Sequence, residues 1–194
     1  MTIGTFANSA SRLLARFRRD AAGLAAVEFA IILPLVFVIF FGTIEVSTGV
    51  AVDRKVTMLT RTISDLISQA QIITDTDISN SFAMGAAMMT PYASAPIKAK
   101  ISQIYIDPTT HKAKVKWSKA SNDTAHSCNE VVSIPSGLAI DGTYLIMSEV
   151  SYSYTPVVGH QLWNNAPTFN LSDRTFTRPR QSDSVSYPSA PACS

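Results

Sequence analysis

The chain has 194 residues, with 16 Lys and Arg against 14 Asp and Glu, and so a formal net charge of +2. Charged residues make up 15% and hydrophobic residues 46% of the sequence, a composition too apolar for a disordered chain. The near-neutral total also disfavours a nucleic-acid-binding protein, which normally carries a concentrated basic face.

The start of the chain divides into a basic leader and a long apolar run. Residues 1–23 contain four arginines against one aspartate. From Leu24 to Ile44 the only charged residue is Glu28, and the run has no polar stripe. A helix of this length spans roughly 31 Å, close to the thickness of the hydrocarbon core of a bilayer. The sequence therefore predicts a transmembrane helix over residues 24–45.

The basic residues predict the orientation of that helix. Four arginines precede the apolar run, whereas Arg54 and Lys55 follow it at a greater distance. By the positive-inside rule the leader is cytoplasmic and everything after Glu45 lies outside. Removal by an ordinary signal peptidase is disfavoured, because residues 46–51 lack an A-x-A site and the run is longer than a typical signal-peptide core.

Residues 46–180 are expected to form an α+β head domain, which is long enough to have its own core. Apolar residues recur at three- and four-residue steps from residue 46 to 70, so the membrane helix is expected to continue as an amphipathic second half. A shorter helix is expected from a cap at Thr74 or Asp75 to Met89.

Four strands of an antiparallel sheet are predicted after these helices, over residues 97–106, 112–117, 143–154 and 174–178. In the second of them lysines alternate with other residues, which predicts one solvated face rather than a nucleic-acid site. Residues 181–194, rich in Ser and Pro, are expected to form a flexible tail unless Cys193 anchors them.

The segment from Arg16 to Ala30 has a recognisable arrangement. A basic leader ends at Gly23, Glu28 is the fifth residue after that glycine, and Phe29 follows it. In these features the chain resembles the TadE/TadG-like family, minor pilin-like proteins of the tight-adherence (Flp) type IV pilus system. The Leu33-Pro34-Leu35 step and the stretch from Arg174 to Arg180 are also similar to the family.

The resemblance implies a pilin-like fold and a part in assembling an adhesive pilus, and the length favours the TadE branch. It implies cleavage after Gly23 by a prepilin peptidase, which leaves Leu24 as the new N-terminus. Glu28 would then pair with the Leu24 amine of its own or a neighbouring subunit. The implied partners are the peptidase, other pilin-like subunits, the Tad secretion machinery and the lipid bilayer, with no nucleic acid. The implied location is the bacterial inner membrane, with the C-terminal domain periplasmic or extracellular.

Two other classes of protein stay open. One is a single-pass periplasmic binding or envelope protein that is never cleaved, in which Glu28 simply reaches water near the headgroups. The other is an anchored hydrolase, although no G-x-S-x-G elbow is present. His111, His126 and His160 have no metal-ligand spacing, and no glycine-rich cofactor motif occurs. We therefore expect no catalytic residue, no metal and no cofactor.

Cys128 and Cys193 are the two cysteines, and both lie in the part predicted to face an oxidising compartment. A disulfide between them would close a loop of about 65 residues and contribute roughly 4 kcal/mol on the chain-entropy model. Free thiols are the alternative.

Overall fold

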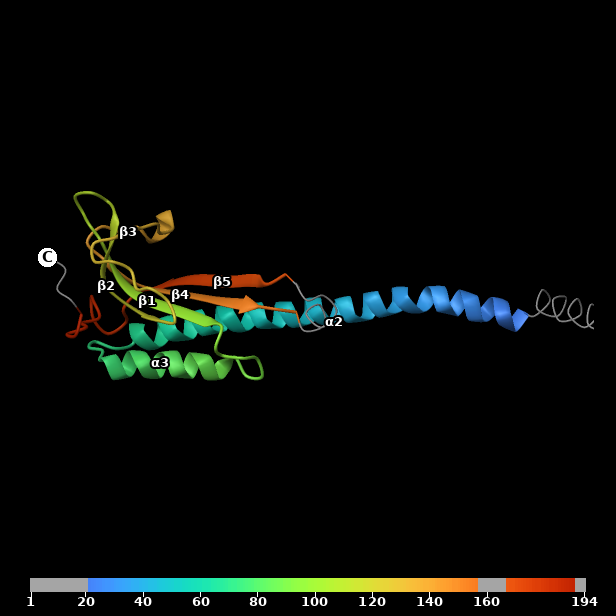
Figure 1. The fold of residues 1–194 in the computed structure, drawn as a ribbon. Helices are drawn as coiled ribbons and strands as arrows, with labels where there is room; N and C mark the ends of the chain where they lie inside the picture. The colour runs from blue at the N-terminus through green and yellow to red at the C-terminus, as the bar shows by residue number, and fades with distance from the viewer. Residues whose placement is uncertain (1–20, 157–166, 191–194) are drawn as a thin grey trace, which may run out of the picture. The chain divides into compact units, whose positions relative to one another are not determined.

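The computed structural model describes residues 21–156 and 167–190 (Figure 1). The chain divides into two compact units, residues 1–46 and residues 47–194. Helix α2, Ala21–Ser68, contributes to both of them and continues through Pro34. Each unit is described by itself below.

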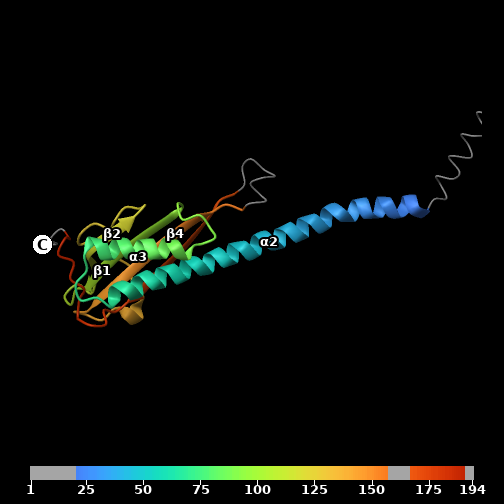
Figure 2. The same cartoon turned by 90° about the horizontal axis from the view of Figure 1, so that it is seen from below.

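The C-terminal unit is a two-layer α+β domain built on a five-stranded antiparallel sheet. The strand order is β3-β2-β1-β4-β5. Residues 47–68 of α2 and helix α3 lie side by side against one face of this sheet (Figures 1 and 2). The bounds are α3 Asp75–Met88, β1 Ile97–Ile106, β2 Ala113–Ser121, β3 Val131–Val132, β4 Tyr144–Tyr154 and β5 Phe169–Thr177, with a 3-10 turn η1 at Ser136–Leu138.

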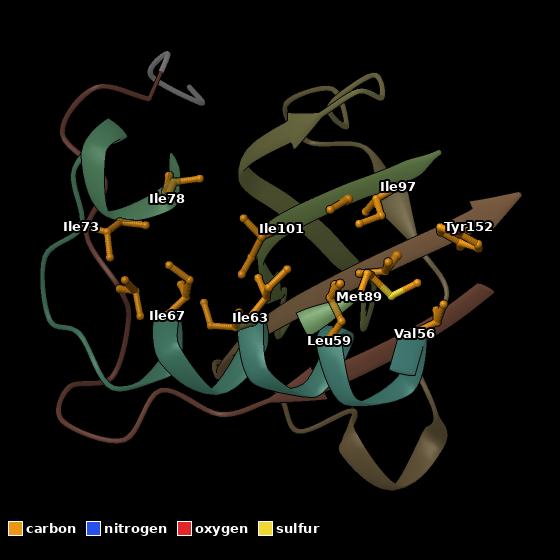
Figure 3. Packing of buried hydrophobic residues seen from close by; sticks show 14 of the residues in the cluster. Val56, Leu59, Ile63, Ile67, Ile73, Ile78, Met89, Ile97, Ile101 and Tyr152 are labelled. Atoms are coloured by element: carbon orange, nitrogen blue, oxygen red, sulfur yellow. The ribbon is translucent and has the colours of Figure 1, made fainter. Parts of the chain in front are cut away.

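The main core lies between the helices and the sheet. The apolar stripe of α2 predicted from its spacing is buried here, and its side chains point at strands β1 and β4 (Figure 3). Leu59 and Ile63 are each 1% exposed. Gly85 allows α3 to approach this stripe, because a Cβ at that position would lie 3.2 Å from both Leu59 and Ile63. The core residues of α2 are Val52, Val56, Leu59, Ile63 and Ile67.

A smaller core lies on the opposite face of the sheet. Along β1, Ile101 belongs to the main core whereas Ile104 and Ile106 belong to the smaller one. This is the alternation expected of a strand that is buried on both faces. Half-buried Val132, Ile134 and Leu138, from β3 and the segment through η1, cover the smaller core.

Helix α3 begins and ends as its sequence predicts. The Thr74 hydroxyl accepts a hydrogen bond from the N–H of Asp77, and the Asp77 side chain accepts one from the N–H of Thr74, which is a capping box. At the other end, Lys55 Nζ donates to the carbonyl oxygens of Met88 and Thr90, at 2.8 and 2.9 Å. A lysine from α2 thus caps the last turn of α3 and complements its dipole.

The α+β class, the long helix and the shorter helix are confirmed. Three details of the sheet differ from the expectation. Strand β3, of two residues, was not predicted. Strand β2 continues to Ser121 rather than ending at Trp117, and β5 begins at Phe169 rather than at Arg174.

The described part of the C-terminal tail is packed on the C-terminal unit, whereas the sequence predicts flexibility unless Cys193 anchors it; the anchoring by Cys193 stays a prediction. Residues 180–190, called here the C-terminal strap, pack on the end of the main core. Val185 is fully buried, its N–H donates to Gln103 Oε1 at 2.7 Å, and its carbonyl accepts from Trp117 Nε1 at 3.0 Å. The strap is held because two buried polar side chains of the sheet need these backbone partners. Residues 191–194 lie outside the described residues.

Candidate functional site

The first candidate site is the apolar part of α2, within residues 1–46. Its large side chains are exposed on all sides; Leu24 is 64%, Phe29 64% and Val38 70% exposed. By length and composition this helix is able to cross a membrane, and none of its most apolar window is buried inside the protein. An exposed apolar surface of this size marks contact with lipid or with other apolar helices. The helix is thus a candidate membrane anchor.

The predicted processing bond, Gly23–Leu24, lies in the first turn of α2. No atom lies within 4 Å of the position that a Cβ on Gly23 would take, so its backbone is open to approach. Glycine lowers helix stability by about 1 kcal/mol relative to alanine, so Gly23 weakens the helix beside the predicted processing bond. The basic leader, residues 1–20, lies outside the described residues.

Glu28 is exposed on α2, one turn after Leu24. Among the described residues it has no ion-pair or hydrogen-bond partner. Side chains on a helix tilt toward its N-terminus, which directs the Glu28 carboxylate back toward the backbone nitrogen of Leu24. An unpartnered carboxylate in an apolar helix is costly in lipid, and a cation beside Glu28 would lower that free-energy cost.

Residues 23–63 match the family described as TadE-like protein. This part of the chain is similar to that family. Comparisons with curated proteins and with solved structures find no significant match.

The TadE-like segment starts at Gly23, the glycine of the predicted processing bond. It contains the apolar part of α2 and continues into the residues of α2 that pack on the sheet, ending at the core residue Ile63. The match thus includes Leu24 and Glu28 and supports the resemblance seen in the sequence.

A second candidate site is a charged cluster on the sheet face opposite the helices. His126, from the segment between β2 and β3, places Nδ1 2.9 Å from Glu130 and Nε2 2.5 Å from Glu149 of β4. Arg174 of β5 pairs with the other oxygen of Glu149. Only the imidazolium form of His126 donates from both ring nitrogens. We call these four residues the His126 clamp.

The electrostatics of the clamp favour charged carboxylates. Burial alone would raise the pKa of Glu149, but the hydrogen bond from His126 and the charge of Arg174 lower it overall. The hydrogen bond from His126 also lowers the pKa of Glu130. The clamp holds the 122–130 segment against the sheet. The backbone N–H of His126 also donates a hydrogen bond to Ser118 Oγ of β2.

The sequence did not predict the clamp, because its members come from three separate elements without motif spacing. His111 pairs with Asp141 on the surface, and His160 and Cys193 lie outside the described residues. Cys128, exposed in the turn before β3, has no free thiol, and its pairing with Cys193 stays a prediction. Among the described residues, no group of three potential ligands could hold a metal ion.

The lysines of the predicted hairpin do not form a uniform solvated face. Lys114 pairs with Asp107 at 2.7 Å, and Lys116 lies over the ring of Tyr105. Lys119 pairs with Asp75 at 2.7 Å. These three lysines thus contact Asp107 after β1, Tyr105 of β1 and Asp75 of α3.

Proposed function

We propose that this chain is a membrane-anchored, pilin-like component for the assembly of an adhesive Tad pilus and that it acts without catalysis. The observation that carries the proposal is the TadE-like match, which starts at Gly23 and covers the exposed apolar helix. The excess of arginines in the leader supports a cytoplasmic N-terminus and a periplasmic C-terminal unit.

In this proposal a prepilin peptidase of the inner membrane hydrolyses the Gly23–Leu24 bond. The basic leader is released on the cytoplasmic side, and Leu24 gains a free amine. Because the Glu28 side chain tilts toward that amine, the new cation lies within reach of the carboxylate, in the same subunit or in a neighbouring one. Pairing lowers the cost of both charges near the bilayer and orders the helix for packing against other pilin-like helices.

The test of this role is the variant Glu28→Ala, produced in cells that lack the native copy. We expect normal membrane insertion, because the helix becomes more apolar, and loss of surface pili and adhesion. Glu28→Asp is the matched control, which keeps the charge and is expected to restore part of the assembly.

Two results would contradict the pairing role of Glu28. One is normal adhesion with Glu28→Ala. The other is equal loss with Glu28→Ala and Glu28→Asp while both variants reach the membrane in normal amounts.

A further inference from the structure

One end of the C-terminal unit is tied to the candidate membrane anchor by a short length of chain. A Cβ on Gly49 of α2 would lie 3.7 Å from Cε1 of Tyr154, the last residue of β4. Gly49 comes four residues after Glu45, where the predicted membrane span ends, and four residues of chain reach at most about 14 Å. Whatever the bend of α2, the end of β4 is therefore held near the surface of the bilayer.

The start of β5 lies at the same end of the sheet as the end of β4 (Figure 1). Phe169 faces Tyr154 across the β4–β5 pair. One residue beyond them on each side, the hydroxyl oxygens of Thr155 and Thr168 lie 3.3 Å apart. We call these four residues, together with Val50 next to Gly49, the anchor-side rim.

Two large apolar side chains of the anchor-side rim are exposed. Phe169 is 51% and Val50 is 50% exposed. Single exposed apolar residues are common on soluble proteins and need no explanation by themselves. Here they lie at the end of the unit that the chain holds near the bilayer, and such side chains favour the boundary between lipid headgroups and acyl chains.

The sequence around the rim also lacks charge. Residues 151–172 contain no Lys, Arg, Asp or Glu, although charged residues make up 15% of the chain. The loops at the opposite end of the sheet contain Asp107 and Asp141. On α2 close to Val50, the neighbours Asp53 and Arg54 have opposite charges. Because a charge is costly to bring against lipid, this distribution favours contact with lipid at the rim.

We propose that the anchor-side rim docks on the headgroup region of the bilayer that holds α2, with Phe169 and Val50 inserted among the lipids. This contact is a second attachment of the chain to the membrane, besides the apolar helix, and it limits how far the C-terminal unit moves away from the bilayer. The inference rests on the membrane anchoring in the proposed function, but not on cleavage after Gly23 or on pilus assembly.

The test uses the full chain in vesicles of phosphatidylethanolamine and phosphatidylglycerol. The photoreactive residue p-benzoylphenylalanine replaces Phe169 or Val50 in the rim, one position at a time. After illumination, mass spectrometry shows whether the attached molecule is a lipid or a second copy of the chain.

Two further positions are controls for this experiment. Ile140 is 47% exposed, similar to Phe169, but precedes the start of β4. Since β4 has 11 residues, its two ends are roughly 33 Å apart. Val38, which is 70% exposed in the apolar part of α2, reports whether the anchor itself is in the bilayer.

We expect lipid adducts at positions 38, 50 and 169 and none at position 140. Val50→Asp should lower the yield of the lipid adduct at position 169 severalfold, because a carboxylate in the rim opposes its insertion. Val131→Asp is the matched control; it makes the same change at a valine of β3 that is 56% exposed and should leave the yield unchanged.

Three results would overturn the proposal while the anchor stands. They are a lipid adduct at position 38 without one at position 169, equal yields of lipid adduct at positions 169 and 140, and attachment of position 169 to a second copy instead of lipid. Absence of a lipid adduct at position 38 would contradict the anchoring itself, and the rim contact with it.

Discussion

The His126 clamp provides a stability prediction whose size follows from the structure. The side chains of His126 and Glu149 are 14% and 16% exposed, so their hydrogen bond is largely shielded from water. A hydrogen bond to a charged group contributes about 1.5–3 kcal/mol. The bond to Glu130, which is 41% exposed, adds little because solvent screens it. We therefore expect His126→Ala to lower the free energy of unfolding by about 2 kcal/mol.

The matched control is His111→Ala. His111 also pairs with a carboxylate, Asp141, but its side chain is 71% exposed. Exposed pairs contribute about 0.2–1 kcal/mol, so the control should change stability much less.

The assay is urea denaturation of the full chain in detergent, followed by the tryptophan fluorescence, to which buried Trp117 contributes. A larger decrease for His126→Ala than for His111→Ala is the predicted result. Equal decreases would refute the argument that burial makes the clamp strong.

Four further predictions follow from named contacts. The pKa of Glu149 is lowered in the folded state from its ordinary value of 4.5, so the stabilisation that the Glu149 carboxylate gives is complete above pH 4.5 and is lost as the pH falls through the folded-state pKa. The loss of unfolding free energy caused by His126→Ala should therefore become smaller in acid. The same loss at about pH 3 as at neutral pH would contradict this. Gly85→Val should lower the free energy of unfolding by about 1–3 kcal/mol, because its Cβ would crowd Leu59 and Ile63 at 3.2 Å; an unchanged urea midpoint would show that α3 moves away freely. Lys55→Met keeps the aliphatic part of the side chain but removes both hydrogen bonds to the end of α3. Hydrogen exchange should therefore become faster at residues 86–90 and stay unchanged at residues 75–78, and an equal change at both ends of α3 would argue against a capping role. Finally, the intact mass of unreduced protein should be two hydrogens lower than that of the reduced protein if Cys128 and Cys193 pair, and a full reaction with a thiol reagent before reduction would exclude the disulfide.

The helices could be predicted from the sequence because their signals are local. The apolar spacing of residues 46–70 repeats at helical steps, and Thr74 with Asp77 forms a capping box within one turn. The resemblance to the family is local too, because Gly23 and Glu28 stand in one short segment that the family match covers; cleavage after Gly23 and the role of Glu28 stay predictions.

The parts that were missed depend on contacts between distant residues. The first half of β5 was missed because it contains Asn170, Ser172 and other polar residues and few apolar ones. An edge strand is not buried on both faces and therefore does not need a continuous apolar pattern. Val185 gave no signal within a stretch rich in Ser and Pro, since its burial depends on Gln103 and Trp117, about 80 and 70 residues earlier in the chain. No spacing rule joins His126, Glu149 and Arg174.

The N-terminal sequence of the protein extracted from native membranes shows whether this chain is processed as a pilin-like protein. We expect a start at Leu24, which should be lost when the peptidase is deleted and in Gly23→Ala. Gly42→Ala is the control, because a Cβ at this second open helical glycine also meets no atom within 4 Å; it should be cut normally. A start at Met1 or Thr2 in cells that contain the peptidase would mean that the chain is not processed in this way, and it would then be an uncleaved, single-pass envelope protein.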